Sequence, residues 1–468
     1  MRKAGFVVSA PCSGAGKTTV TRALMAALVR RGLRVQPFKC GPDYIDTKFH
    51  SAVCGRPSVN LDTFLASPDH VRRLFARYGE GADVCVVEGM MGLFDGYDRS
   101  RGSTAGIARL LGLPVVMVVD ARHAGYSVAP LLRGFASFDE SVPLAGVLFN
   151  NVGSPRHERL LRQASADAGL DCFGCLPRRR GMDQPSRYLG LDFTQALCDD
   201  GWVEWIEEHV EQKPPLAPKP PLAPPFGGES EAQQEPPLTP PIGGLGDHSS
   251  FLIPHSSFPP GGAHIVVARS PEAFSFIYQE HLDLLASCGR VTFFDPSQDG
   301  ELPADTDLLY LPGGYPEQHA ASLQAASRIR SSIRRYSEDG GRILAECGGM
   351  IYLCERLLCD DGSYDLCGVL PYTISARSAD RHLSLGYRQI TYNGLALKGH
   401  EFHYTQFVAP PAPPIGGETS GGLGGASVCD ACGAPVPTPF FRYHNVLASY
   451  THLYWGEINS PFQLFNEE

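Results

Sequence analysis

Residues 11–19, Pro11-Cys12-Ser13-Gly14-Ala15-Gly16-Lys17-Thr18-Thr19, decide the fold of the N-terminal half of the chain. An apolar strand expected at Phe6–Ala10 precedes this glycine-rich stretch, and a helix expected at Thr18–Arg30 follows it. A loop between a strand and a helix aims backbone N–H groups and the helix N-terminus at phosphate oxygens. We therefore interpret the stretch as a phosphate-binding loop rather than a chance glycine-rich turn, although Pro11 replaces the first glycine of the usual pattern.

Each residue of this loop has an expected task. Gly14 and Gly16 let the backbone approach the phosphates. Lys17 neutralises phosphate charge, and the hydroxyl of Thr18 can bind Mg²⁺. We expect these four residues, together with the adjacent Thr19, to bind a nucleotide.

Four more apolar strands alternate with helical stretches up to residue 200. They are expected at Val35–Lys39, Val84–Glu88, Val115–Asp120 and Leu144–Asn150. The alternation predicts an α/β fold with a doubly wound parallel sheet, as in P-loop NTPases. Such a sheet binds its ligands at the carboxyl ends of its strands.

Acidic residues follow two of these strands. Glu88 ends the apolar run 84–87, where a carboxylate is costly unless it meets a cation. We interpret Glu88 as a Mg²⁺ ligand in preference to a buried capping acid. Asp43 and Asp46 follow the second strand beside Pro42 and are either functional residues or helix caps. We favour a functional role for both.

Composition narrows the classes of partner. The 468 residues carry a formal net charge of −10, which argues against a nucleic-acid or anionic-membrane surface. No apolar run approaches the ~18–20 residues of a membrane span. The N-terminus has only a short apolar run before Pro11, so we expect no leader and a cytoplasmic location.

Proline and glycine gather in two runs, residues 214–262 and 409–425, which together hold 18 Pro and 13 Gly. Both runs repeat a Pro-Pro-(Phe/Ile)-Gly-Gly unit, which is typical of extended linkers and, as the alternative, of ligands for proline-binding domains. We expect an ATP-binding domain at residues 1–212, a linker without secondary structure at 213–262, and a second domain at 263–468 with a Pro/Gly-rich insertion at 409–439.

The cysteines indicate reduced thiols rather than a scaffold of disulfides. Two Cys-x-x-Cys pairs, Cys172/Cys175 and Cys429/Cys432, formally allow a four-thiolate zinc site. Their separation far exceeds the spacing of zinc ribbons, so we interpret them as ordinary thiols. The basic run Arg178-Arg179-Arg180 could contact a substrate that carries several carboxylates, but a solvated run of surface charges explains it equally well. We therefore leave it out of the candidate residues.

The C-terminal half shows a second α/β pattern. Strands and helices are expected at His264–Arg269, Ala273–Ser287, Val291–Asp295, Leu308–Gly314, Ala320–Glu338 and Ile343–Cys347. Cys347 ends a strand, and Gly348-Gly349 lead from it into a helix. A thiol at such a turn faces a helix N-terminus, where thiolate is favoured and neighbouring N–H groups can hold an oxyanion. We interpret Cys347 as a nucleophile rather than a buried core cysteine.

A thiol nucleophile requires a base, and three histidines are candidates. His400 and His403 lie in Gly399-His400-Glu401-Phe402-His403-Tyr404, and His452 lies near the end of the chain. The residue types alone leave the choice open.

The motifs of the first half resemble the ATP-dependent half of the cobyrinate a,c-diamide synthase family, which is similar to dethiobiotin synthetase. They are Gly14-x-Gly16-Lys17-Thr18-Thr19, Gly41-Pro42-Asp43-Tyr44-Ile45-Asp46, Asn60-Leu61-Asp62 and Glu88-Gly89-x-x-Gly92-Leu93-Phe94-Asp95-Gly96. The resemblance implies that Lys17 and Lys39 face phosphate oxygens. It implies Mg²⁺ ligands in Thr18, Asp46 and Glu88, and substrate contacts in Asp43, Tyr44 and Asp95. The chain departs from the family at Gln184–Leu191, where an acidic-Pro-Arg-His run usually precedes Leu-Gly-Leu.

Motifs of the second half resemble the triad-type (class I, flavodoxin-like) glutamine amidotransferase domain of the same family. They are Leu311-Pro312-Gly313-Gly314-Tyr315-Pro316-Glu317, Cys347-Gly348-Gly349 and His452. The resemblance implies that Cys347 attacks glutamine, that His452 carries the proton, and that Gly314 and Gly348 flank the oxyanion hole. Tyr454 stands where many such domains have a glutamate, so the third triad member is unassigned. Residues 400–404 then become a substrate or domain contact rather than the base.

The resemblance implies a ligase of cobalamin biosynthesis that amidates the a- and c-acetate carboxylates of cobyrinate with glutamine and ATP. Cobyrinate, glutamine, ATP and Mg²⁺ are the expected small-molecule partners, and homodimer formation is left open. The alternatives are cobyric acid synthase, a nickel-sirohydrochlorin diamide synthase, and a partition-type P-loop switch ATPase with a relic amidotransferase domain.

Overall fold

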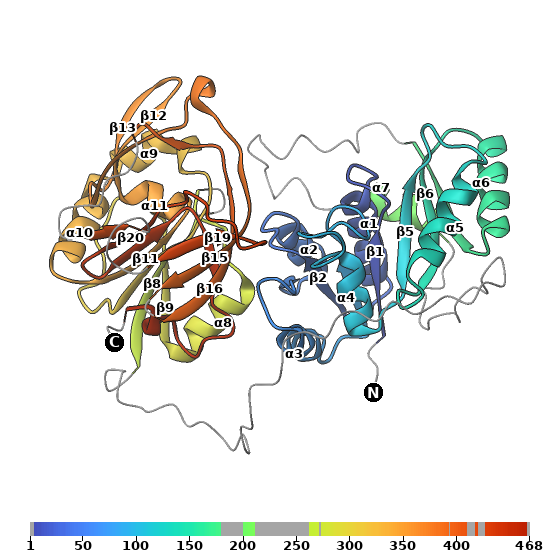
Figure 1. Ribbon diagram of the computed structural model, residues 1–468, viewed down its shortest axis with the longest axis horizontal. Coiled ribbons are helices and arrows are strands. Elements are labelled where there is room, and N and C mark those ends of the chain that lie inside the picture. Colours follow the sequence, from blue (N-terminus) through green and yellow to red (C-terminus); the bar gives the residue numbers. More distant parts are fainter. Residues whose placement is uncertain are drawn as a thin grey trace, which may run out of the picture.

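The structure, a computed structural model, consists of two α/β domains (Figure 1). It describes residues 4–178, 200–210, 262–270, 273–392, 394–409, 417–419 and 426–465. The expected linker 213–262, apart from Gly262, and the divergent segment Gln184–Leu191 lie outside the described residues. Within the described ranges, no helix has both the length and the apolar character needed to cross a membrane.

The N-terminal domain is built on a parallel sheet of seven strands in the order β3-β2-β4-β1-β5-β6-β7. Its strands are β1 (Gly5–Ser9), β2 (Val35–Cys40), β3 (Val59–Leu61), β4 (Val84–Glu88), β5 (Val115–Asp120), β6 (Leu144–Val152) and β7 (Asp171–Pro177). Its helices are α1 (Lys17–Arg30), α2 (Asp46–Cys54), α3 (Pro68–Tyr78), α4 (Thr104–Leu111), α5 (Val128–Phe138), α6 (Pro155–Asp167) and α7 (Asp200–His209). The doubly wound sheet expected from the sequence is therefore confirmed.

Side chains of the central strand β1 alternate between two cores. Phe6 and Val8 pack with residues of α1 and α7, whereas Val7 packs with residues of α3, α4, α5 and α6. Both faces of β1 are buried, which explains its unbroken apolar run. Because β2, β4 and β1 are neighbours, the loops that follow them meet at one edge of the sheet.

The C-terminal domain has a seven-stranded sheet in the order β18-β20-β21-β11-β10-β8-β9, parallel from β21 to β9. Its strands are β8 (Ala263–Ala268), β9 (Gly289–Phe294), β10 (Leu308–Leu311), β11 (Arg342–Glu346), β18 (Gly417–Thr419), β20 (Phe440–Tyr443) and β21 (Val446–Ser449). Its helices are α8 (Gln279–Cys288), α9 (Ala320–Ala325), α10 (Ser327–Glu338) and α11 (Gly348–Leu353), with short 3₁₀ turns at Pro316–Gln318, Ser378–Asp380 and Pro461–Phe465.

Two four-stranded sheets that the sequence analysis missed complete this domain. One has the order β13-β12-β14-β17 and the other β19-β15-β16-β22. Their strands are β12 (Cys354–Cys359), β13 (Gly362–Asp365), β14 (Leu370–Ser375), β15 (Ser384–Tyr392), β16 (Leu395–His403), β17 (Gln406–Phe407), β19 (Ser427–Asp430) and β22 (His452–Tyr454). Strands β18 and β19 lie within the expected insertion 409–439 and pair with β20 and β15, so this stretch also supplies sheet edges.

Two expected helices differ from the structure. The helix expected at Ala273–Ser287 begins only at Gln279, because Phe276 instead donates its backbone N–H to the carbonyl of Gly313 at 3.0 Å. The helix expected at Ala320–Glu338 is broken at Ala326, whose ψ of 65° is not helical.

Aromatic and polar side chains join the two domains. Tyr44 and Phe64 of the first domain share one buried cluster with Phe276, Tyr278 and Tyr387 of the second. In Figure 1, α2 and α3 lie on the side of the N-terminal domain that faces the C-terminal domain. The loops of the N-terminal domain that carry Tyr44 and Phe64 therefore pack against the C-terminal domain.

Candidate active sites in two domains

The phosphate-binding loop between β1 and α1 relies on left-handed glycines. Gly14 and Gly16 have φ angles of 78° and 90°, which side chains with a Cβ rarely adopt. A Cβ on Gly16 would also lie 2.3 Å from the side-chain nitrogen of Asn150. Asn150, at the end of β6, donates from that nitrogen to the carbonyl of Ala15 at 3.1 Å. No sequence motif points to Asn150.

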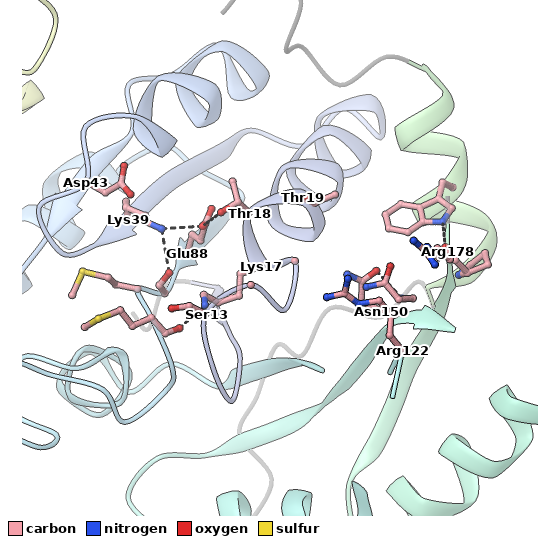
Figure 2. A pocket seen from close by; sticks show the side chains of 18 residues that line it. Ser13, Lys17, Thr18, Thr19, Lys39, Asp43, Glu88, Arg122, Asn150 and Arg178 are labelled. Carbon is pink, nitrogen blue, oxygen red and sulfur yellow. Dashed lines mark hydrogen bonds and ion pairs between the residues drawn. The ribbon is translucent and has the colours of Figure 1, made fainter. Parts of the chain in front are cut away.

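The loop borders a cavity of about 570 Å³, which we call the nucleotide cavity (Figure 2). Eight expected residues line it: Gly14, Gly16, Lys17, Thr18, Thr19, Lys39, Asp43 and Glu88. Figure 2 shows Arg122, Asn150 and Arg178 on the side opposite Lys39 and Glu88. Arg178 is the first residue of the basic run that the sequence analysis set aside. Arg178 therefore lies at the nucleotide cavity.

A buried ionic cluster lies at the floor of this cavity. Lys39 Nζ is 2.7 Å from Asp46 Oδ2 and 2.9 Å from Glu88 Oε1. Glu88 also contacts His50 Nε2 at 2.7 Å and accepts a hydrogen bond from Thr18 Oγ1 at 2.6 Å. Burial alone would raise the pKa of Glu88, but Lys39 and His50 outweigh it and hold the pKa well below its usual range. Glu88 is therefore a carboxylate.

These oxygens fit a magnesium ion. Thr18 Oγ1 lies 2.6 Å from a Glu88 oxygen and 3.5 Å from Asp46 Oδ2, so one hydroxyl and two carboxylates converge beside the phosphate-binding loop. Mg²⁺ prefers oxygen ligands and commonly shares them with substrate phosphates. The described residues hold no cluster of three or more His, Cys, Asp or Glu side chains suited to a metal. The two carboxylates and one hydroxyl are thus a partial set that phosphate oxygens would complete.

The loop after β2 is held rigidly by its own polar groups. Asp43 Oδ1 accepts the backbone N–H groups of Ile45 and Asp46, both at 2.9 Å, which is the geometry of a helix cap. Asp43 also lines the nucleotide cavity, so its hydrogen bonds to the start of α2 do not conflict with the functional role that the sequence analysis favours. Asp95, in contrast, accepts the N–H of Gly92 at 2.9 Å. It lines neither the nucleotide cavity nor the two cavities that lie between the domains.

Cys347 occupies a sharp turn between β11 and α11. Its φ and ψ are 47° and −107°, a conformation that is strained for a residue with a side chain. The turn packs on the Gly313-Gly314 segment, where a Cβ on Gly348 would lie 2.9 Å from the backbone nitrogen of Gly314. The structure therefore brings the two expected oxyanion residues, Gly314 and Gly348, beside each other. Burial raises the pKa of the Cys347 thiol.

His452, on β22, lies over the neighbouring glycine. A Cβ on Gly313 would be 2.1 Å from the His452 ring, so only glycine permits this contact. Burial lowers the pKa of His452 to about 3, which keeps the ring neutral at pH 7. Its Nδ1 has no hydrogen-bond partner among the described residues. Because Gly313 contacts His452 and Gly314 contacts Gly348, which follows Cys347, the Gly313-Gly314 segment lies beside both the thiol turn and the histidine.

The other candidate histidines have different environments. His403 Nε2 contacts Glu401 at 2.8 Å, and its Nδ1 lies 2.9 Å from the carbonyl of Thr405. His400 pairs with His452 across β16 and β22. Tyr454, which stands in the usual place of the triad glutamate, donates its hydroxyl to Glu280 on α8 at 2.5 Å.

A cavity of about 250 Å³ lies between the nucleotide cavity and His452, and we call it the inter-domain cavity. Tyr44, Met90 and Met91 line it from the first domain, and Phe276, Tyr315, His400 and His452 line it from the second. It shares Asp43, Met90 and Met91 with the nucleotide cavity. Tyr44, expected to contact substrate, is largely buried and packs on Phe276 and His452.

Known proteins agree with this two-site architecture. A family model described as a CobQ/CobB/MinD/ParA nucleotide binding domain matches residues 6–189, and a CobB/CobQ-like glutamine amidotransferase domain matches residues 264–460. The hydrogenobyrinate a,c-diamide synthase of Streptomyces coelicolor is 38% identical over 96% of this chain and 94% of its own length. The chain belongs to the hydrogenobyrinate a,c-diamide synthase family. The synthase of Rhodobacter capsulatus is 38% identical over 97% of this chain and 99% of its own, and that of Brucella abortus is 40% identical over 86% and 89%.

Membership of the hydrogenobyrinate a,c-diamide synthase family confirms the resemblance, the pairing of two α/β domains and the class of glutamine-dependent ligase. The residues that sequence reasoning missed in this family member share one property. Asn150, Arg122 and Phe276 each stand outside any motif and reach a site only through the fold.

Proposed function

We propose that the chain uses ATP and glutamine to convert the a- and c-acetate carboxylates of cobyrinate, or of hydrogenobyrinate, to amides in cobalamin biosynthesis. One observation carries the proposal beyond the family name. Asp43, Met90 and Met91 border both the nucleotide cavity and the cavity that His452 lines. A carboxylate placed between these cavities is within reach of both activating phosphate and incoming ammonia.

Glutamine hydrolysis would begin at Cys347. The neutral ring of His452 accepts the proton of the Cys347 thiol, and the sulfur attacks the side-chain amide carbon as that proton leaves. Backbone N–H groups at Gly314 and Gly348 would stabilise the oxyanion. The C–N bond then breaks, and His452 returns the proton to the departing ammonia. Water hydrolyses the thioester to glutamate and restores the thiol.

Carboxylate activation would occur at the phosphate-binding loop. Lys17 and Lys39 neutralise the triphosphate, and Thr18, Asp46 and Glu88 would hold Mg²⁺, which adds positive charge beside the transferred phosphate. An acetate oxygen of the substrate attacks the γ-phosphorus, and the bond to ADP breaks. The product is an acyl phosphate, whose phosphate is a far better leaving group than oxide. We place Asp43, Tyr44 and, more remotely, Asp95 around the substrate carboxylate.

Ammonia would cross the inter-domain cavity in its neutral form. Apolar walls, which include Met90, Tyr44 and Phe276, disfavour its protonation to ammonium before it attacks the acyl phosphate. Attack forms the amide and releases inorganic phosphate. The cavity would thereby link the two half-reactions by a short path between the domains.

Two variants test this division of labour. Cys347→Ala should lose amidation with glutamine but keep amidation with added ammonium salt. Lys17→Ala should lose amidation with either nitrogen source while it still hydrolyses glutamine. Amide products are counted by mass spectrometry, with cobyrinate and hydrogenobyrinate as substrates. Full glutamine-dependent activity in Cys347→Ala would refute the assignment of the nucleophile, and absence of amide product in the wild-type protein would refute the proposed function.

A further inference from the structure

A third cavity, of about 400 Å³, opens next to the inter-domain cavity, and we call it the outer cavity. Both domains contribute to its walls, Tyr97 from the first and Tyr387 and Arg388 from the second. It shares Met91, Leu385 and His400 with the inter-domain cavity, so the two spaces adjoin. A molecule in the outer cavity can therefore extend one arm inward towards the two reactive centres.

Two exposed apolar side chains face this opening from opposite domains. Met91 is 40% exposed and Leu385 is 56% exposed, which makes them two of the large apolar side chains that the fold leaves in water. Scattered apolar residues on a surface need no explanation. Met91 and Leu385 are not scattered, because both line the same two adjoining cavities.

The backbone at Met91 is held in place by the phosphate-binding loop. Its φ of 49° lies in the left-handed region, which costs a residue with a side chain roughly 1–3 kcal/mol. Lys17 donates its ammonium to the Met91 carbonyl oxygen. This contact holds the backbone of the exposed methionine beside the nucleotide cavity, and the side chain projects from that backbone into the adjoining cavities.

Aromatic and polar groups lie behind the apolar pair. The rings of Tyr97 and Tyr387 meet edge to face with centroids 5.9 Å apart. Tyr387 donates its hydroxyl to Asp62 at 2.6 Å, which fixes the ring across the domain boundary. The guanidinium of Arg388 and the imidazole of His400 are the basic groups among the outer-cavity walls. The outer cavity is thus apolar at its rim and aromatic behind it. One wall carries Arg388, whose Nε is 2.7 Å from a Glu401 oxygen, together with Asp430 and His400, and burial lowers the pKa of His400 to about 4.

We propose that Met91 and Leu385 form a platform for the flat face of the tetrapyrrole substrate, with one acetate arm in the inter-domain cavity. This inference rests on the proposed function and places its substrate. A tetrapyrrole has apolar faces and a rim of carboxylates, so its faces gain from leaving water while its rim does not. Pockets for drug-sized ligands span roughly 300–1,000 Å³. The inter-domain cavity, about 250 Å³, suits an acetate arm, and the wider opening suits the ring.

Substitutions at the two exposed side chains test the platform. Leu385→Ala and Met91→Ala should each raise KM for cobyrinate about five- to tenfold. KM for ATP should stay within twofold in Leu385→Ala, because Leu385, unlike Met91, does not line the nucleotide cavity. Leu385→Met conserves the apolar contact and should stay within twofold of wild type for cobyrinate. Leu160→Ala, at a leucine that is 41% exposed on α6 outside the three cavities, is the matched control and should change neither constant.

Equilibrium binding of cobyrinate, followed by its visible absorbance without ATP, gives a second readout. The Kd should rise in the same order as KM across the variants. An unchanged KM and Kd in both Leu385→Ala and Met91→Ala, with normal wild-type amidation, would overturn the platform and leave the proposed function intact. An equal rise in KM for ATP in Leu385→Ala would also overturn it, because that side chain would then act on nucleotide binding. Wild-type protein that amidates no tetrapyrrole acid would overturn both.

Discussion

The ring of Tyr44 lies 5.1 Å, centroid to centroid, from the imidazole of His452, although the two residues belong to different domains. Tyr44 is part of the loop that also carries Asp46, whose carboxylate contacts Lys39 at 2.7 Å. One short loop therefore reaches from the floor of the nucleotide cavity to the proposed base of glutamine hydrolysis.

Replacement of this ring should impair glutamine hydrolysis. His452 Nδ1 has no hydrogen-bond partner among the described residues, so packing against Tyr44, Phe276 and Gly313 holds the ring in position. Tyr44→Ala should lower kcat for glutamine hydrolysis roughly 10- to 100-fold, because small displacements of a catalytic group are costly. Tyr44→Phe should keep most of the rate. Tyr126→Ala is the control, because Tyr126 is exposed, donates its hydroxyl to Asp167 and lines none of the three cavities. A wild-type rate in Tyr44→Ala would show that the packing does not position His452.

Loss of the Glu88 charge should separate the two half-reactions. Glu88→Gln removes the negative charge that faces Lys39, His50 and Thr18. We expect ATP-dependent amidation to fall on the order of 10- to 100-fold, with a higher requirement for Mg²⁺, while glutamine hydrolysis continues. Phosphate release measured across a Mg²⁺ titration gives the result. Circular dichroism must confirm folding, since Lys39 would keep only Asp46 as its partner in this cluster.

A matched control for that experiment is Asp83→Asn. Asp83 is an exposed carboxylate that pairs with Arg34 at 2.8 Å, away from the nucleotide cavity. Its replacement should leave both half-reactions within twofold. If Glu88→Gln and Asp83→Asn had equal effects, Glu88 would have no special part in nucleotide use.

Glu280 should keep the two reactions coupled. Its carboxylate accepts from Tyr454 at 2.5 Å and contacts His70 of the nucleotide domain at the same distance, so it bridges β22 and α3. Glu280→Ala should loosen the domain contact and let ammonia escape. We expect the number of glutamines hydrolysed per amide formed to rise severalfold. Unchanged stoichiometry, measured from glutamate and amide in the same reaction, would argue against the bridge.

The sequence predicted what local patterns control. The Gly14–Thr18 motif and the apolar strands determined the first sheet, because a buried parallel strand and a phosphate-binding loop each leave a continuous pattern in the chain. Cys347 was predicted as a nucleophile for the same reason, since its glycine-flanked turn is local, and the structure places it at such a turn between β11 and α11. The ranges expected for β4 and β5 coincide with those of the structure.

Contacts between residues far apart in the sequence could not be predicted. Asn150 contacts Ala15 from 135 residues away, and Tyr387 reaches Asp62 from 325 residues away. No spacing rule links such pairs. The two small sheets of the second domain were missed because their short strands follow the regular α/β pattern without a clear repeat. The role of Tyr44 at the domain contact likewise depends on docking, which composition and periodicity do not encode.

The last prediction concerns pH. Glu346, next to Cys347, is buried and accepts hydrogen bonds from Tyr310 at 2.8 Å and from the N–H of Leu453 at 3.2 Å. Burial raises its pKa from 4.5 to about 8, against the smaller effect of these hydrogen bonds. The folded chain therefore holds a proton that the unfolded chain releases above pH 4.5. Stability from this group is complete below pH 4.5 and is lost as pH rises towards 8.

Glu346→Gln removes the titration and keeps the side-chain shape. The variant should gain stability relative to wild type between pH 5 and pH 8, by up to about 1.4 kcal/mol for each pKa unit of the shift. Thermal unfolding midpoints at several pH values measure this difference, and Glu338→Gln, at an exposed glutamate on α10, is the control. A difference between Glu346→Gln and wild type that is constant across this range would mean that Glu346 is already ionised in the folded protein at pH 5, and that its charge beside Cys347 is stabilised by contacts stronger than burial.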